Sequence, residues 1–249
     1  MKGEVTSSVD GYGLIASVYD SYLFDFSYTK YAGYIKKKIK ENKIKGAILD
    51  AGCGTGTLLS LLSSSLDNEL IGIDNCEEML SIAEKKNTRA ILLAQDITGY
   101  KLSSTVGCVV STLDVINHLK SLSLVLKFFT CTANHLEENG IFIFDMNLPY
   151  KHEKILSDDS YIYEVDGSVL LWRNKPYKKK VLIGLDVFLR SDGGMYKRYR
   201  TEFYEYTYAL DEIEKLLNKY FLVLEISDGE TFSKLTENSQ RALIYTKRK

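Results

Sequence analysis

The stretch LDAGCGTGTLL, residues 49–59, ends an apolar run with a glycine-rich turn just before a helix can begin. The turn carries glycine at three alternate positions: Gly52, Gly54 and Gly56. A strand that ends at Asp50, this turn and a helix from about Thr57 would form the nucleotide-binding corner of an open parallel sheet. Because glycine lacks a Cβ, such a turn can adopt positive φ angles and lets a ligand approach the main chain closely. The stretch therefore predicts a ligand site at the carboxyl end of this strand.

Short apolar runs alternate with helical patterns between residues 46 and 146. Five of these runs indicate buried strands: AILDAG, ELIGID, AILLAQD, VGCVVST and GIFIFDM. Asn75 and Glu78 form a capping-box pattern that predicts the start of one helix. Helical apolar spacing from Leu122 predicts another helix, which Gly140 would end. Strands that alternate with helices indicate βαβ units, and hence a parallel sheet with helices on both faces.

The pattern changes after Pro149. From about Tyr161 to Tyr208, apolar side chains recur at every second position, and the SDGG stretch at residues 191–194 predicts a hairpin turn. This region is too long to be a loop, so we predict three or four antiparallel strands.

The α/β pattern resumes beyond residue 208, with a helix that Asp211 and Glu214 would cap and two closing strands. We therefore predict an α/β domain formed by residues 1–149 and 209–249. An antiparallel β insertion at residues 150–208 would interrupt it.

Composition excludes several classes of function. The chain has 249 residues and a net charge of −1, which argues against bulk electrostatic affinity for nucleic acid. It shows neither a signal-peptide pattern nor an apolar run long enough to span a membrane, so we expect a cytoplasmic protein. Its four cysteines form no C-x-x-C pair, so we expect reduced, mostly buried thiols and no metal site.

A basic run in the predicted insertion allows two interpretations. It contains Arg173, Lys175, Lys178, Lys179 and Lys180. With the neighbouring aromatic residues it could form an RNA-binding surface. It could equally be a solvated hairpin bend whose lysines prevent edge-to-edge strand pairing. The modest net charge favours the second interpretation.

Asp74 lies about 20 residues beyond the glycines, at the end of the second predicted strand, where a carboxylate can accept hydrogen bonds from ribose hydroxyls. Dinucleotide and nucleoside cofactors share that arrangement, so the glycine spacing must discriminate between them. The pattern here is G-x-G-x-G, one position shorter than the dinucleotide pattern G-x-G-x-x-G. This spacing argues against a bound pyrophosphate, and the absence of a lysine after the glycines argues against a P-loop.

Four stretches together resemble the class I S-adenosylmethionine-dependent methyltransferases: LDAGCGTG, GIDNCEEML, AQDI and LEENGIFIFD. They occur in the family's order and spacing across roughly residues 40–147. The resemblance implies a Rossmann-like, mostly parallel sheet of seven strands, the last of them antiparallel. With the β insertion after the fifth strand, the chain looks most like the small-molecule N- or O-methyltransferase branch.

The resemblance also implies a cofactor pocket for S-adenosylmethionine. The main chain of Gly52 and Gly54 would face the methionine part, with Asp50 and the carbonyl of Leu113 at its amino group. Asp74 would hold the ribose, and Asp96 with the backbone of Ile97 would bind the adenine. Carboxylates and carbonyls suit a cationic sulfonium cofactor, whereas a phosphate would require lysine or arginine.

Catalytic candidates follow the fourth strand or lie near the N-terminus. Methyl transfer needs mainly alignment of nucleophile, methyl carbon and sulfur, and it needs a base only when the nucleophile arrives protonated. His118 could accept a proton, and Asp114 could orient an amine. Three N-terminal tyrosines could close over the cofactor: Tyr12, Tyr19 and Tyr31. We expect residues 7–20 to become ordered when the cofactor binds.

These features predict transfer of a methyl group from S-adenosylmethionine to nitrogen or oxygen of a small molecule. Three alternatives stay open at this point. They are a methyltransferase that acts on RNA or protein, a nicotinamide-dependent Rossmann oxidoreductase, and a non-catalytic cofactor-binding scaffold.

Overall fold

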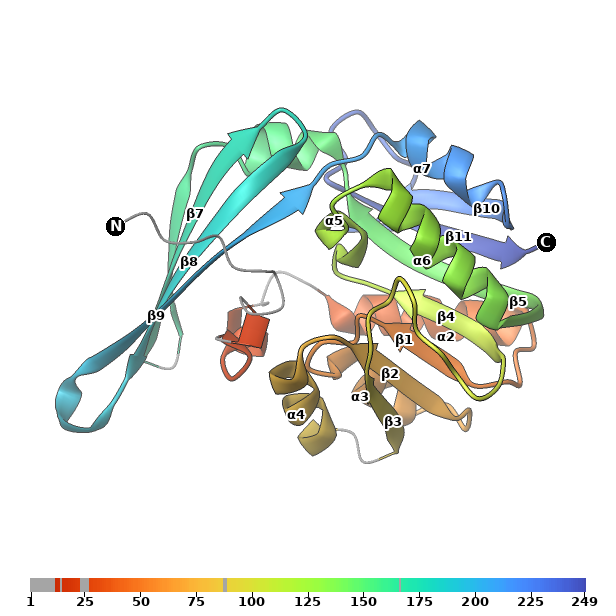
Figure 1. Ribbon diagram of the computed structural model, residues 1–249, viewed down its shortest axis with the longest axis horizontal. Helices are drawn as coiled ribbons and strands as arrows, with labels where there is room; N and C mark the ends of the chain where they lie inside the picture. Colours follow the sequence, from red (N-terminus) through yellow and green to blue (C-terminus); the bar gives the residue numbers. More distant parts are fainter. Residues whose placement is uncertain (1–11, 14, 23–26, 87–88, 166) are drawn as a thin grey trace.

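The computed structural model describes residues 12–13, 15–22, 27–86, 89–165 and 167–249. Part of the expected N-terminal lid, residues 7–11 and 14, lies outside these ranges. The described chain forms two sheets, one of seven strands and one of four (Figure 1). Among the described residues, no helix is both long and apolar enough to cross a membrane.

The larger sheet has the strand order β10-β11-β5-β4-β1-β2-β3. Its strands are β1 (Ile48–Ala51), β2 (Leu70–Asp74), β3 (Ala90–Ala94), β4 (Val106–Ser111), β5 (Leu136–Asn147), β10 (Phe221–Asp228) and β11 (Arg241–Arg248). Neighbouring strands from β3 to β5 pair in parallel, whereas β11 is antiparallel to both β5 and β10. The predicted seven-stranded, mostly parallel sheet with an antiparallel last strand is confirmed.

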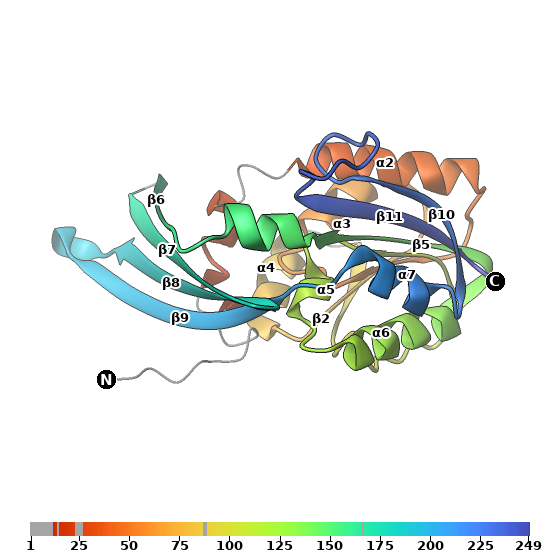
Figure 2. The ribbon, with the colours of Figure 1, turned by 90° about the horizontal axis from the view of Figure 1, so that it is seen from above.

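Helices cover both faces of this sheet, as Figure 2 shows from above. One face carries α2 (Tyr28–Glu41), α3 (Thr57–Ser63) and α4 (Glu77–Lys86), and the other carries α5 (Val115–His118), α6 (Leu122–His135) and α7 (Leu210–Leu217). Consecutive residues of β1 point to opposite faces, so Ile48 packs in the first layer and Leu49 in the second. Burial on both faces explains why the strands are continuous apolar runs.

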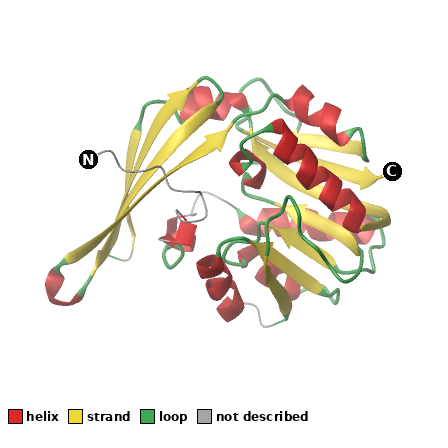
Figure 3. Cartoon of the chain, in the orientation of Figure 1, coloured by secondary structure: helices red, strands yellow, loops and turns green. Residues whose placement is uncertain are grey.

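Four antiparallel strands form the smaller sheet, drawn as yellow arrows at the left of Figure 3. They are β6 (Ser160–Val165), β7 (Ser168–Tyr177), β8 (Lys180–Arg190) and β9 (Tyr196–Tyr206). The predicted SDGG turn joins β8 to β9, where Gly193 has φ 77° and Gly194 has φ 78°. The strands lie inside the predicted insertion of residues 150–208, although the limits of that insertion stay a prediction.

Three expected helix ends were wrong by a few residues. α6 ends at His135 rather than at Gly140, because Leu136 is buried and pairs with Val106 in the ladder between β4 and β5. α4 begins at Glu77, and Asp74, not Asn75, accepts the hydrogen bond from the amide of Cys76.

α7 also begins earlier than expected. Ala209 is its N-cap, and the Glu212 carboxylate accepts the Ala209 N–H at 3.0 Å, so Asp211 and Glu214 do not form the cap. The helix ends at Leu217. The strand pairing of Leu136 is a long-range contact that a local pattern does not reveal, whereas at α4 and α7 another nearby acid accepts the backbone N–H at the helix start.

A strained turn follows β4. Leu113 has φ 63° and Asp114 has φ 54°, two consecutive left-handed residues that are not glycine. The Asp145 carboxylate of β5 accepts both of their backbone N–H groups, at 3.0 and 2.7 Å. Arg241 of β11 donates to Asp145 at 2.9 Å and to Asp114 at 2.8 Å. This arginine–carboxylate clamp, formed by Asp114, Asp145 and Arg241, fixes the backbone where β4 ends.

Replacing Asp145 by alanine is expected to destabilise the protein by about 3–5 kcal/mol, because it leaves a buried guanidinium and two backbone N–H groups short of an acceptor. Urea unfolding measures the loss. The same change at Asp67, an exposed loop residue, should stay within about 0.5 kcal/mol of wild type. Equal stabilities for the two variants would show that the clamp does not stabilise the fold.

Candidate active site

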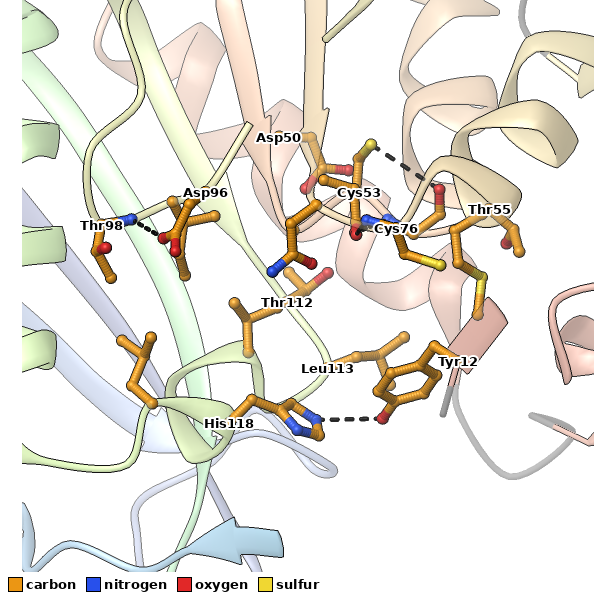
Figure 4. A pocket seen from close by; sticks show the side chains of 18 of the residues that line it. Tyr12, Asp50, Cys53, Thr55, Cys76, Asp96, Thr98, Thr112, Leu113 and His118 are labelled. Atoms are coloured by element: carbon orange, nitrogen blue, oxygen red, sulfur yellow. Dashed lines mark hydrogen bonds between the residues drawn. The ribbon is translucent and has the colours of Figure 1, made fainter. Parts of the chain in front are cut away.

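A cavity of about 380 Å³ lies at the carboxyl ends of the central parallel strands (Figure 4). Its lining includes every predicted site residue except Asp114 and Tyr31: Tyr12, Tyr19, Asp50, Gly52, Gly54, Asp74, Asp96, Ile97, Leu113 and His118. The structure thus brings together side chains from four strand ends and from the N-terminal segment.

The three glycines of the turn meet three different surroundings. A Cβ on Gly52 would lie 2.6 Å from Val115 Cγ2, and a Cβ on Gly56 would lie 2.8 Å from Ala83 of α4. At Gly54, which has φ 50°, no heavy atom of the described residues lies within 4 Å of the Cβ position. Two glycines therefore permit close packing, whereas Gly54 leaves space into which a ligand can come against the main chain.

Asp50 is a buried carboxyl with a free oxygen. It is 2% exposed, and its Oδ1 atom has no hydrogen-bond partner among the described residues. Burial, together with the nearby Asp74 carboxylate, raises the pKa of Asp50 to about 8. A buried carboxyl without a partner is stabilised by a cationic group, so this wall of the cavity suits a ligand ammonium.

Asp74 holds the glycine turn as well as lining the cavity. Its Oδ2 accepts the N–H of Gly54 at 2.8 Å, and its Oδ1 accepts the N–H of Cys76 at 3.0 Å. Burial raises the pKa of Asp74, and these backbone hydrogen bonds work against that rise. A carboxylate has about four acceptor positions, so Asp74 can still accept a hydrogen bond from a ligand hydroxyl.

Asp96 lies at the far end of the same cavity, beyond β3. Its exposed carboxylate accepts the backbone N–H of Thr98 at 2.7 Å, a local turn bond that Figure 4 shows. Asp96, Ile97 and Thr98 of this turn all line the cavity.

A second cavity, of about 670 Å³, adjoins the first and lies against the β insertion. Aromatic residues form much of its wall: Tyr22, Tyr161, Tyr163, Trp172 and Phe203. Asp114 and Tyr31 line this cavity rather than the first. Tyr12, Tyr19 and Leu113 line both cavities, and we call this shared set the throat.

His118 of α5 stands beside the throat. Its Nε2 and the Tyr12 hydroxyl form a hydrogen bond of 3.1 Å, visible in Figure 4, and its buried Nδ1 has no partner among the described residues. Burial raises the pKa of Tyr12 and of Tyr19, so both phenols stay neutral near pH 7. Asp20, next to Tyr19, accepts a hydrogen bond of 2.6 Å from Thr55 in the glycine turn, which anchors this segment over the cavity.

Sequence reasoning missed Glu205, Arg241 and Lys151, all of which line the second cavity. Burial alone would raise the pKa of Asp114, but the nearby Arg241 guanidinium outweighs this effect and the pKa of Asp114 is lowered. Glu205 could have been found, because the alternation in β9 places it on the same face as the buried Phe203. The role of Arg241 could not have been predicted, because its partners Asp145 and Asp114 lie 96 and 127 residues away in the sequence.

The sequence predicts no metal site. Within the described ranges, Asp114, His118 and Glu205 each place one donor atom within 4.8 Å of the others. All four cysteines are unpaired, and three of them are buried.

Asp50→Asn is expected to stabilise the ligand-free protein increasingly as pH rises from 5 to 8. The folded pKa of about 8 exceeds the ordinary value of 3.8, so the folded state binds this proton more tightly and wild-type stability falls across that window. Asparagine removes the titration. Urea unfolding at pH 5, 6.5 and 8 measures the difference between the two proteins. A difference that does not change with pH would mean that Asp50 is not held protonated, and Asp158→Asn, an exposed change, serves as the control.

Known proteins share this arrangement. The family model described as a methyltransferase domain matches residues 48–140. A solved S-adenosylmethionine-dependent methyltransferase from Clostridium acetobutylicum is 30% identical, covers 95% of this chain and 98% of its own, and superimposes with a TM-score of 0.86.

Two curated relatives add to this. A protein of Geobacillus sp. (strain WCH70), whose name places it with the methyltransferases, is 30% identical over 247 residues, 95% of this chain and 99% of that one. A Streptomyces venezuelae enzyme named dTDP-3-amino-3,4,6-trideoxy-alpha-D-glucopyranose N,N-dimethyltransferase is 29% identical over 97 residues, 39% of this chain and 40% of that one.

These likenesses do not support a nicotinamide-dependent oxidoreductase or a non-catalytic scaffold. Because the likeness to the Clostridium enzyme extends over nearly the whole of both chains, the protein belongs to the class I S-adenosylmethionine-dependent methyltransferases.

Proposed function

We propose that the protein methylates a nitrogen atom of a small-molecule amine held in the second cavity. The observation that carries this proposal is the throat, since Tyr12, Tyr19 and Leu113 line both cavities, which are therefore neighbours there. Two carboxylates at that end of the second cavity, Asp114 and Glu205, favour an amine over an anionic acceptor. The Streptomyces venezuelae relative is named for an amino sugar, which is consistent with this choice.

The first cavity fits the family's cofactor, S-adenosylmethionine. The free carboxyl of Asp50 suits the cofactor's ammonium group, and the open space at Gly54 allows it to approach the main chain. We assign the ribose to Asp74 and the adenine edge to Asp96 and Ile97. When bound there, the cofactor supplies a methyl group on a positively charged sulfur.

The residues of the throat would align the reactants. Tyr12 is fixed by its hydrogen bond to His118 and by ring contacts with Tyr19 and Phe203, at 5.5 and 5.2 Å between centroids. The neutral phenol rings of Tyr12 and Tyr19 can lie against a cationic sulfonium without an electrostatic penalty. Alignment of this kind is worth up to about 7–11 kcal/mol. An acceptor that binds as an ammonium would first give one proton to His118, whose Nδ1 has no partner among the described residues. Its nitrogen lone pair would then take the methyl group, and the electrons of the carbon–sulfur bond would stay with the sulfur.

The basic run of the insertion has contacts within the protein. Lys180 lies 3.6 Å from the centre of the Tyr204 ring, Lys179 lies 3.7 Å from Glu212, and Arg173 pairs with the buried Asp186. These contacts support the interpretation as a solvated sheet surface. An RNA or protein acceptor would also have to reach a throat that the insertion covers.

A turnover screen tests the acceptor class. Release of S-adenosylhomocysteine is followed with fractionated metabolite, RNA and protein extracts, and the methylated product is identified by mass. We expect turnover with a small-molecule fraction and a product methylated on nitrogen. Methylation of RNA or protein fractions alone, or of oxygen alone, would contradict the proposal.

Asp74→Asn is expected to bind S-adenosylhomocysteine at least about tenfold more weakly, because a hydrogen bond to a charged group contributes about 1.5–3 kcal/mol. The amide oxygen can still accept one backbone N–H, so the variant should fold. Calorimetric titration measures affinity, and Glu77→Gln, an exposed change three residues further on, should bind as wild type does. Wild-type affinity in folded Asp74→Asn would mean that the acid serves only the turn.

A further inference from the structure

Glu205 of β9 is a buried acid on the wall of the second cavity. It is 4% exposed. Its Oε2 accepts a hydrogen bond from Asn147 Nδ2 at 3.2 Å and lies 3.4 Å from His152 Nε2. Asn147 ends β5 of the α/β part, and His152 belongs to the π-helix η2 (Lys151–Ile155) at the start of the insertion, so Glu205 is held from both sides of that boundary.

The cations near Glu205 make their direct contacts with other groups, although the charge of Lys151 also acts on Glu205. Arg241 bridges Asp114 and Asp145 at 2.8 and 2.9 Å. The ammonium of Lys151 donates to Asn147 Oδ1 at 3.2 Å. The direct contacts of Glu205 that the described residues show are therefore an amide and an imidazole. Burial of a carboxylate costs several kcal/mol unless a cation compensates it, so this site is suited to a cationic ligand.

The carboxylate faces the throat. Glu205, Asp114 and His118 each place a donor atom within 4.8 Å of the other two, and His118 is hydrogen-bonded to Tyr12 of the throat. These atoms come from β9, from the strained turn after β4 and from α5. A group bound among them would lie beside the place where the two cavities meet.

We propose that Glu205 determines acceptor specificity: with Asp114, its carboxylate binds the acceptor nitrogen at the throat and selects amines over hydroxyl compounds of the same shape. The inference rests on the proposed function and adds the residue that recognises the nitrogen. A fixed carboxylate also stabilises the positive charge that the nitrogen gains during methyl transfer. A neutral hydroxyl compound offers no charge with which the carboxylate can pair.

A divalent metal ion is the competing occupant of the same donor atoms. Arg241 holds one of them, because its guanidinium lies 2.8 Å from Asp114 Oδ1, and its positive charge opposes a second cation of higher charge. A singly charged ammonium that donates hydrogen bonds to Glu205 meets less repulsion. The structure therefore favours the amine, and the experiment includes the metal.

Binding of two matched probes tests the proposal without turnover. Benzylamine and benzyl alcohol have the same shape, and the aromatic wall around Trp172 and Phe203 suits their ring. Their affinities are measured by NMR titration at pH 7, on protein saturated with S-adenosylhomocysteine. We expect wild type to bind benzylamine more tightly than benzyl alcohol. Glu205→Gln should weaken benzylamine at least tenfold and leave benzyl alcohol within twofold.

Glu202→Gln is the matched control. It makes the same change on the same strand, but Glu202 pairs with Arg200 at 2.6 Å and does not line the cavity, so both affinities should stay at wild-type values. Glu205→Asp keeps the charge and should retain the preference for benzylamine. Thermal melts and affinity for S-adenosylhomocysteine verify that each variant is folded with an intact cofactor site. If Glu205→Gln does not fold, wild type and Glu205→Asp still decide the result.

The inference would be overturned if wild type showed no preference for benzylamine. It would also be overturned if Glu205→Gln lost affinity equally for both probes, or if Glu205→Asp lost the preference for benzylamine as Glu205→Gln does. Binding of Mn²⁺ to wild type that Glu205→Gln abolishes would assign the donor set to a metal and also overturn it. Because none of these measurements needs methyl transfer, a negative turnover screen contradicts the proposed function alone.

Discussion

The arginine–carboxylate clamp of Arg241, Asp145 and Asp114 determines where the two cavities meet. Left-handed residues other than glycine cost about 1–3 kcal/mol each, and here two of them follow each other. The strain persists because the Asp145 carboxylate accepts both backbone N–H groups and Arg241 neutralises the buried charge. A buried ion pair stabilises a fold only when its remaining hydrogen bonds are satisfied. In this ion pair the remaining hydrogen bonds of Asp145 come from the backbone N–H groups of the strained turn. Leu113 of the same turn lines both cavities.

A second buried contact joins this turn to the insertion. Asn117 of α5 donates from Nδ2 to the carbonyls of Asn147 and Tyr206, at 3.1 and 2.8 Å, and accepts the Asn147 N–H at 2.8 Å. Tyr206 is the residue after Glu205, so one fully buried amide fixes α5, the end of β5 and the end of β9 together. The positions of His118 and Glu205 therefore depend on a common framework, although 87 residues separate them in sequence.

Most of the fold and one side of the site could be predicted from sequence, since the features that specify them are local. The glycine turn, Asp74 and Asp96 follow strand ends, and the parallel topology alone brings such ends together. The expected ends of α6 and α7 were wrong because Leu136 is buried by strand pairing and Glu212 caps its own helix. Tyr31 and Asp114 line the second cavity, which the sequence did not reveal because it forms only where β9 and η2 meet the α/β sheet near β11.

The features that local sequence specifies belong mainly to the first cavity, and those that depend on long-range contacts belong mainly to the second. The methyltransferase domain match, residues 48–140, contains the glycine turn, Asp74, Asp96 and His118. Lys151, Trp172, Glu205 and Arg241, which line the second cavity, lie outside it. Backbone amides and strand ends form most of the first cavity, to which the insertion adds Tyr204 and Tyr206 of β9. The second cavity, the proposed acceptor site, consists of side chains on strands and loops that Asn147, Asn117 and the clamp help to hold in place. Substitutions on β7 or β8, whose residues line the second cavity and not the first, can therefore change the proposed acceptor site while the first cavity stays the same.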